Sequence, residues 1–142
     1  MPRFNLERFV NSSRQKIFDV ATNCQNYEQL LSKYFPSVRI LSSRDNVSVV
    51  EEHMNLGNKE LVMMTKHVVE YPFKHEVFVI GGDAKGTHII ETFEELPQGT
   101  RFNIEVDLKL KGSLMIMGLL GKHKIYGDYS KIVDEIVSVA EF

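Results

Sequence analysis

The sequence has little of what marks the specialised classes of protein. Its single cysteine, Cys24, cannot form an internal disulfide and cannot supply the ligands of a zinc ribbon. The longest apolar run, 114–120, is about a third of the roughly 20 residues that a membrane-spanning helix needs. The 17 basic and 19 acidic residues nearly balance, which leaves no surplus of positive charge to attract nucleic acid. Because the chain also starts without the apolar stretch of a signal peptide, we expect a cytoplasmic protein with no nucleic-acid partner and no integral membrane association.

The short motifs of several common enzyme classes are also absent. The sequence contains no Gly-x-Ser-x-Gly nucleophile elbow and no Walker phosphate-binding loop. The glycines of 81–86 are better explained as a hairpin turn that needs positive φ angles. Cys24 has no histidine near it in the sequence, so nothing there marks it as a nucleophile.

What remains is the pattern of one globular domain that spans 1–142. A chain of this length buries roughly two thirds of the surface it exposes when unfolded. Residues 3–10 alternate in polarity as a strand does, and 38–111 contains strand-like runs without a helical period. Five turn signals divide this second region into six strands that are close enough in sequence to pair as antiparallel hairpins. These turns are 45–46, 57–58, 71–73, 81–86 and 96–99.

Two short helices are expected between the first strand and the second. Ser12, with Gln15 three residues later, fits a capping box that opens the first helix, and Asn23 is a plausible end. Asn26 fits the N-cap of the second helix, which Phe35 ends because it precedes a proline.

A long amphipathic helix is expected at the end of the chain. One stripe of it carries Tyr129, Ile132, Ile136 and Ala140, while charged side chains face away. Glycines weaken the segment before it, so we expect the firm helix to begin near Lys122.

This order of elements resembles the helix-grip fold of the START-like (SRPBCC) superfamily, which includes the major birch-pollen allergen, polyketide cyclases and coenzyme Q-binding proteins. The stretches that carry the resemblance are FVNSSRQKIFDV at 9–20, NYEQLL at 26–31 and FPSV at 35–38. The resemblance implies an α+β fold in which a seven-stranded curved antiparallel sheet has two short helices after strand 1 and a long C-terminal helix over one face. It also implies a hydrophobic small-molecule ligand and no obligatory metal or nucleotide cofactor.

Hairpin geometry predicts which side chains face the inside of the sheet. Facing residues of an antiparallel pair have a constant index sum, and side chains alternate between the two faces. The even residues of 102–110 are apolar, and a turn centred on 97–99 pairs Ile104 with Thr92. Continued through the earlier turns, this register predicts which side chains face inward. They are Val50, Glu52, Met54, Leu61, Met63, Thr65, His67, Val69, His75, Val77, Val79, His88, Ile90, Thr92, Phe102, Ile104, Val106, Leu108 and Leu110. The register leaves two placements open for Arg39, which either meets Glu52 inside or points outward.

This inward set is mostly aliphatic but holds several polar groups. A simple core tolerates them poorly, because each buried polar group without a partner costs ~1–3 kcal/mol. A small-molecule pocket has this composition. The alternative is that some of the histidines lie at a solvated rim of the sheet. The expected ligand-binding residues are Val50, Glu52, Met54, Met63, Thr65, His67, His75, His88, Ile90, Thr92, Phe102, Ile104, Met117, Tyr126 and Tyr129.

Two members of this set are candidates for catalysis. Burial can tune the pKa of a carboxyl or an imidazole toward neutrality, so Glu52 or His67 is suited to acid–base chemistry. His67 and His75 are diagonal neighbours across the 71–73 turn, but two histidines and one carboxylate make a weak metal site. We therefore expect no metal.

Three functions are compatible with these patterns. The first is binding, with or without transport, of a hydrophobic lipid- or quinone-like molecule in a cavity between the sheet and the C-terminal helix. The second is a cyclase- or dehydratase-like enzyme that uses the inward polar residues, and the third is a protein-interaction module whose cavity is vestigial. Residues 113–121 are either a flexible gate at the cavity mouth or a core-packing segment.

Overall fold

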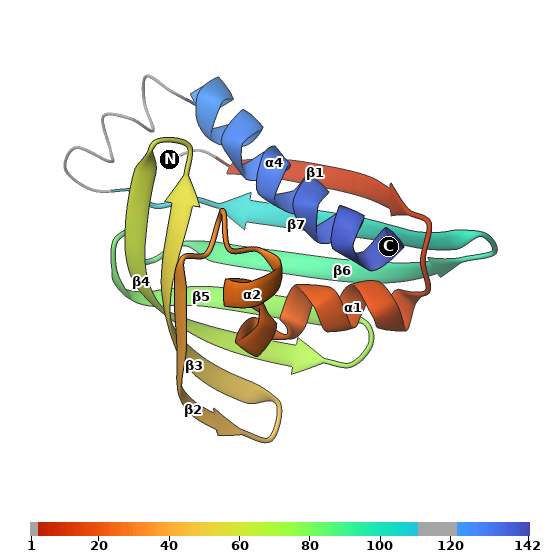
Figure 1. The fold of residues 1–142 in the computed structure, drawn as a ribbon, viewed down its shortest axis with the longest axis horizontal. Helices are drawn as coiled ribbons and strands as arrows, with labels where there is room; N and C mark the ends of the chain where they lie inside the picture. The colour runs from red at the N-terminus through yellow and green to blue at the C-terminus, as the bar shows by residue number, and fades with distance from the viewer. Residues whose placement is uncertain (1–2, 111–121) are drawn as a thin grey trace.

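Seven antiparallel strands form one curved sheet in the order β1-β7-β6-β5-β4-β3-β2 (Figure 1). The computed structural model describes residues 3–110 and 122–142, so the expected gate at 113–121 and the expected ligand contact of Met117 lie outside the described residues. The elements are β1 (Arg3–Val10), α1 (Arg14–Thr22), the 3-10 turn η1 (Cys24–Asn26), α2 (Tyr27–Leu30), β2 (Ser37–Arg44), β3 (Val47–Leu56), β4 (Lys59–Glu70), β5 (Lys74–Gly82), β6 (His88–Leu96), β7 (Gly99–Asp107) and α4 (Lys122–Glu141).

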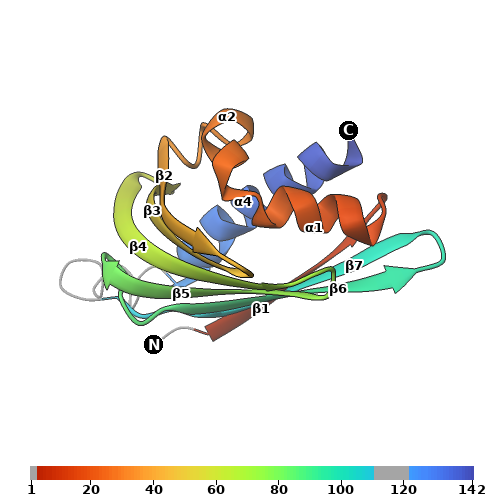
Figure 2. The ribbon, with the colours of Figure 1, turned by 90° about the horizontal axis from the view of Figure 1, so that it is seen from below.

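The helices α1, α2 and α4 all lie on the concave face of the sheet, and strands β2 to β4 curve up around them (Figure 2). Helix α4 buries the apolar stripe that the sequence predicts, including Ile132, Ile136 and Ala140. Even-numbered residues of β7, such as Phe102 and Ile104, are fully buried beneath the helices. The predicted α+β helix-grip fold is therefore confirmed.

The predicted bounds of the two short helices are only partly confirmed. Asn23 does end α1, but its N-cap is Ser13 and not Ser12, because the Ser13 hydroxyl accepts the Lys16 backbone N–H at 3.2 Å. Helix α2 is a single turn that continues from η1, and Asn26 makes no side-chain capping bond there. It ends at Leu30, before the predicted end at Phe35, and the Leu30 side chain is exposed.

Strand β6 is shifted by one residue from its predicted register. A two-residue loop joins Leu96 to its partner Gly99, so Ile104 faces Glu91 and not Thr92. A shift of one residue turns every side chain of a strand to the other face. His88, Ile90 and Thr92 therefore lie on the outer face, and the residues that face inward are Ile89, Glu91 and Phe93.

The predicted inward-facing residues of β3, β4 and β5 are confirmed. The β5–β6 hairpin is also shifted by one residue from its predicted register, and this shift cancels the effect of the β6–β7 shift on the earlier strands. Phe78, and not Val79, pairs with His88 across the β5–β6 hairpin. His67 then pairs with Val77, and Glu52 with Met63, as the hairpin arithmetic predicts.

The open question of Arg39 is resolved by the β2–β3 pairing. Arg39 pairs with Glu51, points outward and makes a 3.3 Å ion pair with it. In 3–110 and 122–142, no helix has the length and apolar character to cross a membrane.

Candidate ligand-binding cavity

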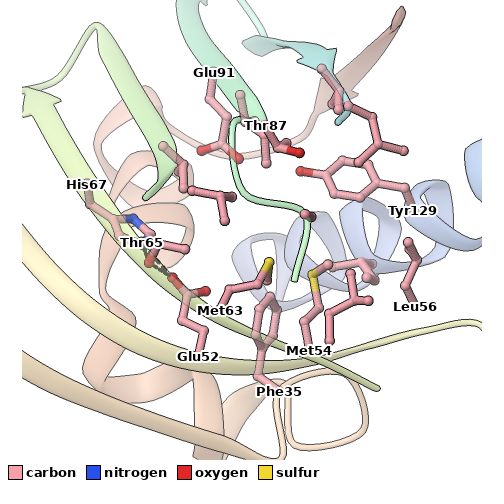
Figure 3. Close-up of a pocket in the computed structure, with 18 of the residues that line it drawn as sticks. Phe35, Glu52, Met54, Leu56, Met63, Thr65, His67, Thr87, Glu91 and Tyr129 are labelled. Carbon is pink, nitrogen blue, oxygen red and sulfur yellow. Dashed lines mark hydrogen bonds and ion pairs between the residues drawn. The ribbon is translucent and has the colours of Figure 1, made fainter. Parts of the chain in front are cut away.

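A cavity of about 70 Å³ lies between the concave face of the sheet and helix α4 (Figure 3). Most of its wall is apolar, with Phe35, Met54 and Met63 among the larger side chains. The polar side chains of the wall are Glu52, Thr65, His67, His75, Thr87, Glu91 and Tyr129. An apolar wall with a few convergent polar groups is the usual composition of a small-molecule site.

The structure brings together about half of the residues expected to bind a ligand. Those that line the cavity are Glu52, Met54, Met63, Thr65, His67, His75 and Tyr129. Val50, Phe102 and Ile104 point inward but pack in the core, away from the cavity wall.

Four expected contacts face away from the cavity. Three of them lie on the outer face of the sheet because the register of β6 differs by one residue from the predicted one: His88, Ile90 and Thr92. Tyr126 is an exposed side chain of α4 whose ring packs edge-on against Phe4, with 5.6 Å between the centroids. Helix α4 turns Tyr129 and not Tyr126 into the cavity, because residues three apart lie about 60° away from each other around a helix.

Four buried side chains cross the inner face of the sheet as one hydrogen-bonded line, here called the polar chain: Glu52, His67, His75 and Glu91. They come from the neighbouring strands β3, β4, β5 and β6. His67 Nε2 lies 2.6 Å from Glu52 Oε2, His67 Nδ1 lies 2.8 Å from His75 Nε2, and His75 Nδ1 lies 2.6 Å from Glu91 Oε1. Their exposed fractions are 4%, 4%, 1% and 6% in chain order.

The two imidazoles meet edge to edge. Their ring centroids are 5.0 Å apart and their planes are inclined by 19°. Nearly coplanar rings at this distance, with two nitrogens only 2.8 Å apart, share one proton between those nitrogens. The bond therefore joins the two halves of the polar chain.

The number of protons in the polar chain follows from its three hydrogen bonds, since each bond needs one proton. Two carboxylates and two imidazoles that together hold three protons carry a net charge of −1, with one imidazole cationic. Either imidazole can carry the extra proton; with it on His67, that ring donates to Glu52 and to His75, and His75 donates to Glu91.

The pKa values agree with this assignment. Burial alone lowers the pKa of His67, but its hydrogen bonds with Cys24 and Glu52 and the charge of Glu52 outweigh burial and raise the pKa to about 10. Burial raises the pKa of Glu52, yet the hydrogen bond and charge of His67 and the hydrogen bond of Thr65 bring it below its usual range. These two directions favour an imidazolium at His67 and a carboxylate at Glu52 at neutral pH.

Two further side chains support His67. The Thr65 hydroxyl donates to Glu52 Oε2 and lies 3.0 Å from His67 Nε2. Cys24 Sγ lies 3.6 Å from Nδ1 and 3.8 Å from Nε2 of His67. Cys24 therefore adds a long hydrogen bond to His67, but both ring nitrogens already bond to Glu52 and His75, so His67 is not a free base that could activate the sulfur.

Acceptor atoms remain free at both ends of the polar chain. Within the described residues, Glu52 Oε1 and Glu91 Oε2 have no hydrogen bond although both carboxyl groups are buried. The Tyr129 hydroxyl also lines the cavity, and burial followed by the charges of Glu91 and Glu52 raises its pKa well above the usual range. It is therefore a neutral group that can donate or accept a hydrogen bond.

Sequence reasoning missed Glu91 and the place of Cys24. Glu91 was hidden by the register error, and its only sequence signal is an acidic residue between the apolar Ile90 and Phe93 of a strand. Cys24 reaches His67 only through the fold, across 43 residues. In 3–110 and 122–142, no group of three histidine, cysteine or acidic side chains has the geometry of a metal site.

A second hollow of about 210 Å³, next to the first, lies between the start of η1 and the β2–β3 hairpin. Cys24 and His67 line it, and His67 also lines the inner cavity. A single layer of side chains therefore separates the polar chain from the exterior at this point.

Comparisons with known proteins agree with this architecture. No family model and no curated protein matches the sequence. Among solved structures, a Thermus thermophilus protein named TTHA0849 matches with a TM-score of 0.81 at 15% identity, over 99% of this chain and 94% of that one. The Zhui aromatase/cyclase of a Streptomyces species matches at 0.77 and 9% identity, over 99% and 93%.

A START superfamily protein of Mycobacterium smegmatis also matches, with a TM-score of 0.74 and 17% identity over 96% of this chain and 97% of that one. At such low identity the likeness concerns the fold. The chain therefore has the helix-grip fold of the START-like superfamily.

Proposed function

We propose that the protein binds a small, mostly apolar molecule in the cavity between the sheet and α4, with the polar end of that molecule at the polar chain. The observation that carries this proposal is the row of four charged or ionisable side chains on an otherwise apolar wall. Buried ionic groups contribute little net stability compared with well-packed apolar residues of similar volume. A role in holding a ligand accounts for their presence better than a role in packing does.

The size of the cavity limits what can enter without rearrangement. A volume of about 70 Å³ holds a few water molecules, whereas the pockets of drug-sized ligands measure roughly 300–1,000 Å³. Met54 and Met63 come from strands β3 and β4 and line the cavity beside Glu52 (Figure 3). Methionine is unbranched and changes shape readily, so a lipid- or quinone-like ligand would need these side chains to move aside.

Native mass spectrometry of freshly purified protein tests this function, followed by extraction of the denatured protein. We expect an apolar passenger at one copy per chain, or a thermal stabilisation by a member of a lipid and quinone panel. A clean apo mass together with no stabilisation by any compound of the panel contradicts the proposal.

One observation favours a second function, acid–base catalysis. The extra proton of the polar chain can reach either carboxylate by shifts along existing hydrogen bonds, so one end can donate a proton while the other accepts one. One proton given to the ligand at Glu52 and one taken from it at Glu91, or the reverse, leaves the number of protons in the polar chain at three. Isomerisation and dehydration are reactions of this kind.

Hydrogen exchange in a small ketone tests the catalytic function. In D₂O we expect the protein to accelerate exchange of the α-hydrogens of acetophenone, followed by NMR. His67→Gln should lower this acceleration about 10²-fold or more, and His88→Gln on the outer face should leave it unchanged. Exchange at the buffer rate, or equal effects of both substitutions, counts against catalysis and leaves binding as the function.

A further inference from the structure

The charge of the cavity wall indicates which ligands it can hold. Among the described residues that line it there is no lysine and no arginine. In this described part of the wall the only cationic group is the shared imidazolium, and the two carboxylates outnumber it. With three protons in the polar chain, the described side chains of the wall carry a net charge of −1.

The two ends of the polar chain are not equivalent. Glu52 accepts from both Thr65 and the cationic His67, so a positive charge lies directly beside it. Among the residues that the structure describes, Glu91 accepts only from His75, whose ring is neutral in this assignment. More of the negative charge is therefore left uncompensated at Glu91.

Glu91 also has the more suitable surroundings for the head group of a ligand. Figure 3 shows it with Thr87 and Tyr129 at one end of the cavity, while Glu52, Thr65 and His67 lie at the other. Glu91 Oε2 has no partner among the described residues, and Thr87 already bonds to the backbone of Lys109. A donor placed between Glu91 and Tyr129 would meet a free carboxylate oxygen and a hydroxyl.

On this basis we propose that the cavity selects apolar molecules that end in a protonated amine, with Glu91 as the principal acceptor, and rejects molecules that end in a carboxylate. Neutral alcohols should bind with intermediate affinity, because they can donate to Glu91 but bring no charge. This selectivity rests on the proposed binding function and deepens it, since it names the chemical class of the ligand.

Three probes of one ring size and different charge test the selectivity: benzylamine, benzyl alcohol and benzoate. Their dissociation constants are measured by NMR titration of the whole chain at pH 7, with shifts of Tyr129 and its neighbours reporting the site. We expect benzylamine to bind at least tenfold more tightly than benzoate, with benzyl alcohol between them. Benzoate binding as tightly as benzylamine overturns the selectivity while supporting the binding function.

Two substitutions separate the local charge of Glu91 from the overall charge of the protein. Glu91→Gln keeps an oxygen that can accept from His75 and should weaken benzylamine about tenfold while changing benzyl alcohol less than threefold. Glu105→Gln removes the same charge from the outer face of β7 and should change neither. Equal weakening by both variants overturns the role of Glu91, and the ranking of the three probes on the unmodified chain decides the selectivity even if Glu91→Gln does not fold.

Failure of the binding function gives a different result. If none of the three probes shifts the resonances of the cavity residues, and toluene does not shift them either, the cavity takes no ligand of this size. In that case the proposed function and the selectivity fall together.

Discussion

The inner and outer faces of the sheet each hold a histidine paired with a glutamate, and the two pairs differ in what surrounds them. His75 and Glu91 on the inner face are almost inaccessible to solvent and belong to a line of four groups. His88 and Glu76 on the outer face are 2.8 Å apart, and their side chains keep 32% and 21% of their exposure. Solvent can replace a lost partner on the outer face, while on the inner face the remaining group is left buried. The same two residue types therefore form a weak surface pair on one face and a structural constraint on the other.

The largest difference should appear when the middle of the polar chain is removed. We expect His75→Ala to lower the free energy of unfolding by about 3–5 kcal/mol, because Glu91 and His67 both lose a buried partner. Urea denaturation at pH 7 measures it. A loss below about 1 kcal/mol would mean that the inner pair is as weakly coupled as a surface pair.

The second-largest change in the free energy of unfolding should come from a change of pH. The folded pKa of His67, about 10, lies above the unfolded value of about 6.5, so its contribution is complete below pH 6.5 and is lost as the pH rises toward 10. Glu52 has a folded pKa below 4.5, so its contribution is present above pH 4.5 and is lost as the pH falls through the folded value. We expect maximal stability between about pH 4.5 and 6.5, with a loss of roughly 2–4 kcal/mol by pH 10.

Urea denaturation at a series of pH values checks this profile, and His67→Leu is the informative variant. The variant should be less stable at pH 6 and show a flatter curve between pH 6.5 and 10. The account is wrong here if the unmodified protein becomes more stable as the pH rises across that window.

Removing the charge of Glu52 should lower the free energy of unfolding less than removing the ring of His75. Glu52→Gln keeps an acceptor oxygen for Thr65 and His67, so we expect a loss of about 1–3 kcal/mol in unfolding free energy. The same variant should lower the pKa of His67 below about 10, because the charge and hydrogen bond of Glu52 help to raise it. NMR titration of the ring measures the change, and an unaltered pKa would show that Glu52 does not stabilise the imidazolium.

The smallest change in the free energy of unfolding should come from the pair on the outer face, His88 and Glu76. The hydrogen bond from His88 lowers the pKa of Glu76, and Lys74 adds a second, exposed partner. His88→Ala should therefore change the free energy of unfolding by no more than about 1 kcal/mol. A loss comparable to that of His75→Ala would remove the distinction between the faces.

Most of the fold was predictable from the sequence, because turn residues and alternation fix the number and facing of strands. The inward facing of Glu52, His67 and His75 was predictable for the same reason. Glu91 was not, since a two-residue loop at Pro97-Gln98 and a three-residue turn there give opposite faces to β6.

The polar chain itself could not be read from the sequence. Hairpin arithmetic places residues on a face, but it does not give the diagonal contacts that bring His67 to His75 and to Cys24. These contacts depend on the curvature of the sheet and on the packing of η1 against it.

The central claim is that the polar chain holds three protons, with the extra one on His67. Long-range ¹H–¹⁵N correlation spectra of the histidine rings at pH 7 test it most directly, with His88 as the solvated reference. The account predicts protons on both nitrogens of His67, a single proton on Nδ1 of His75, and no titration of His67 between pH 5 and 8.5. Two neutral rings with one proton each, or a His67 that titrates between pH 5 and 8.5, would contradict it.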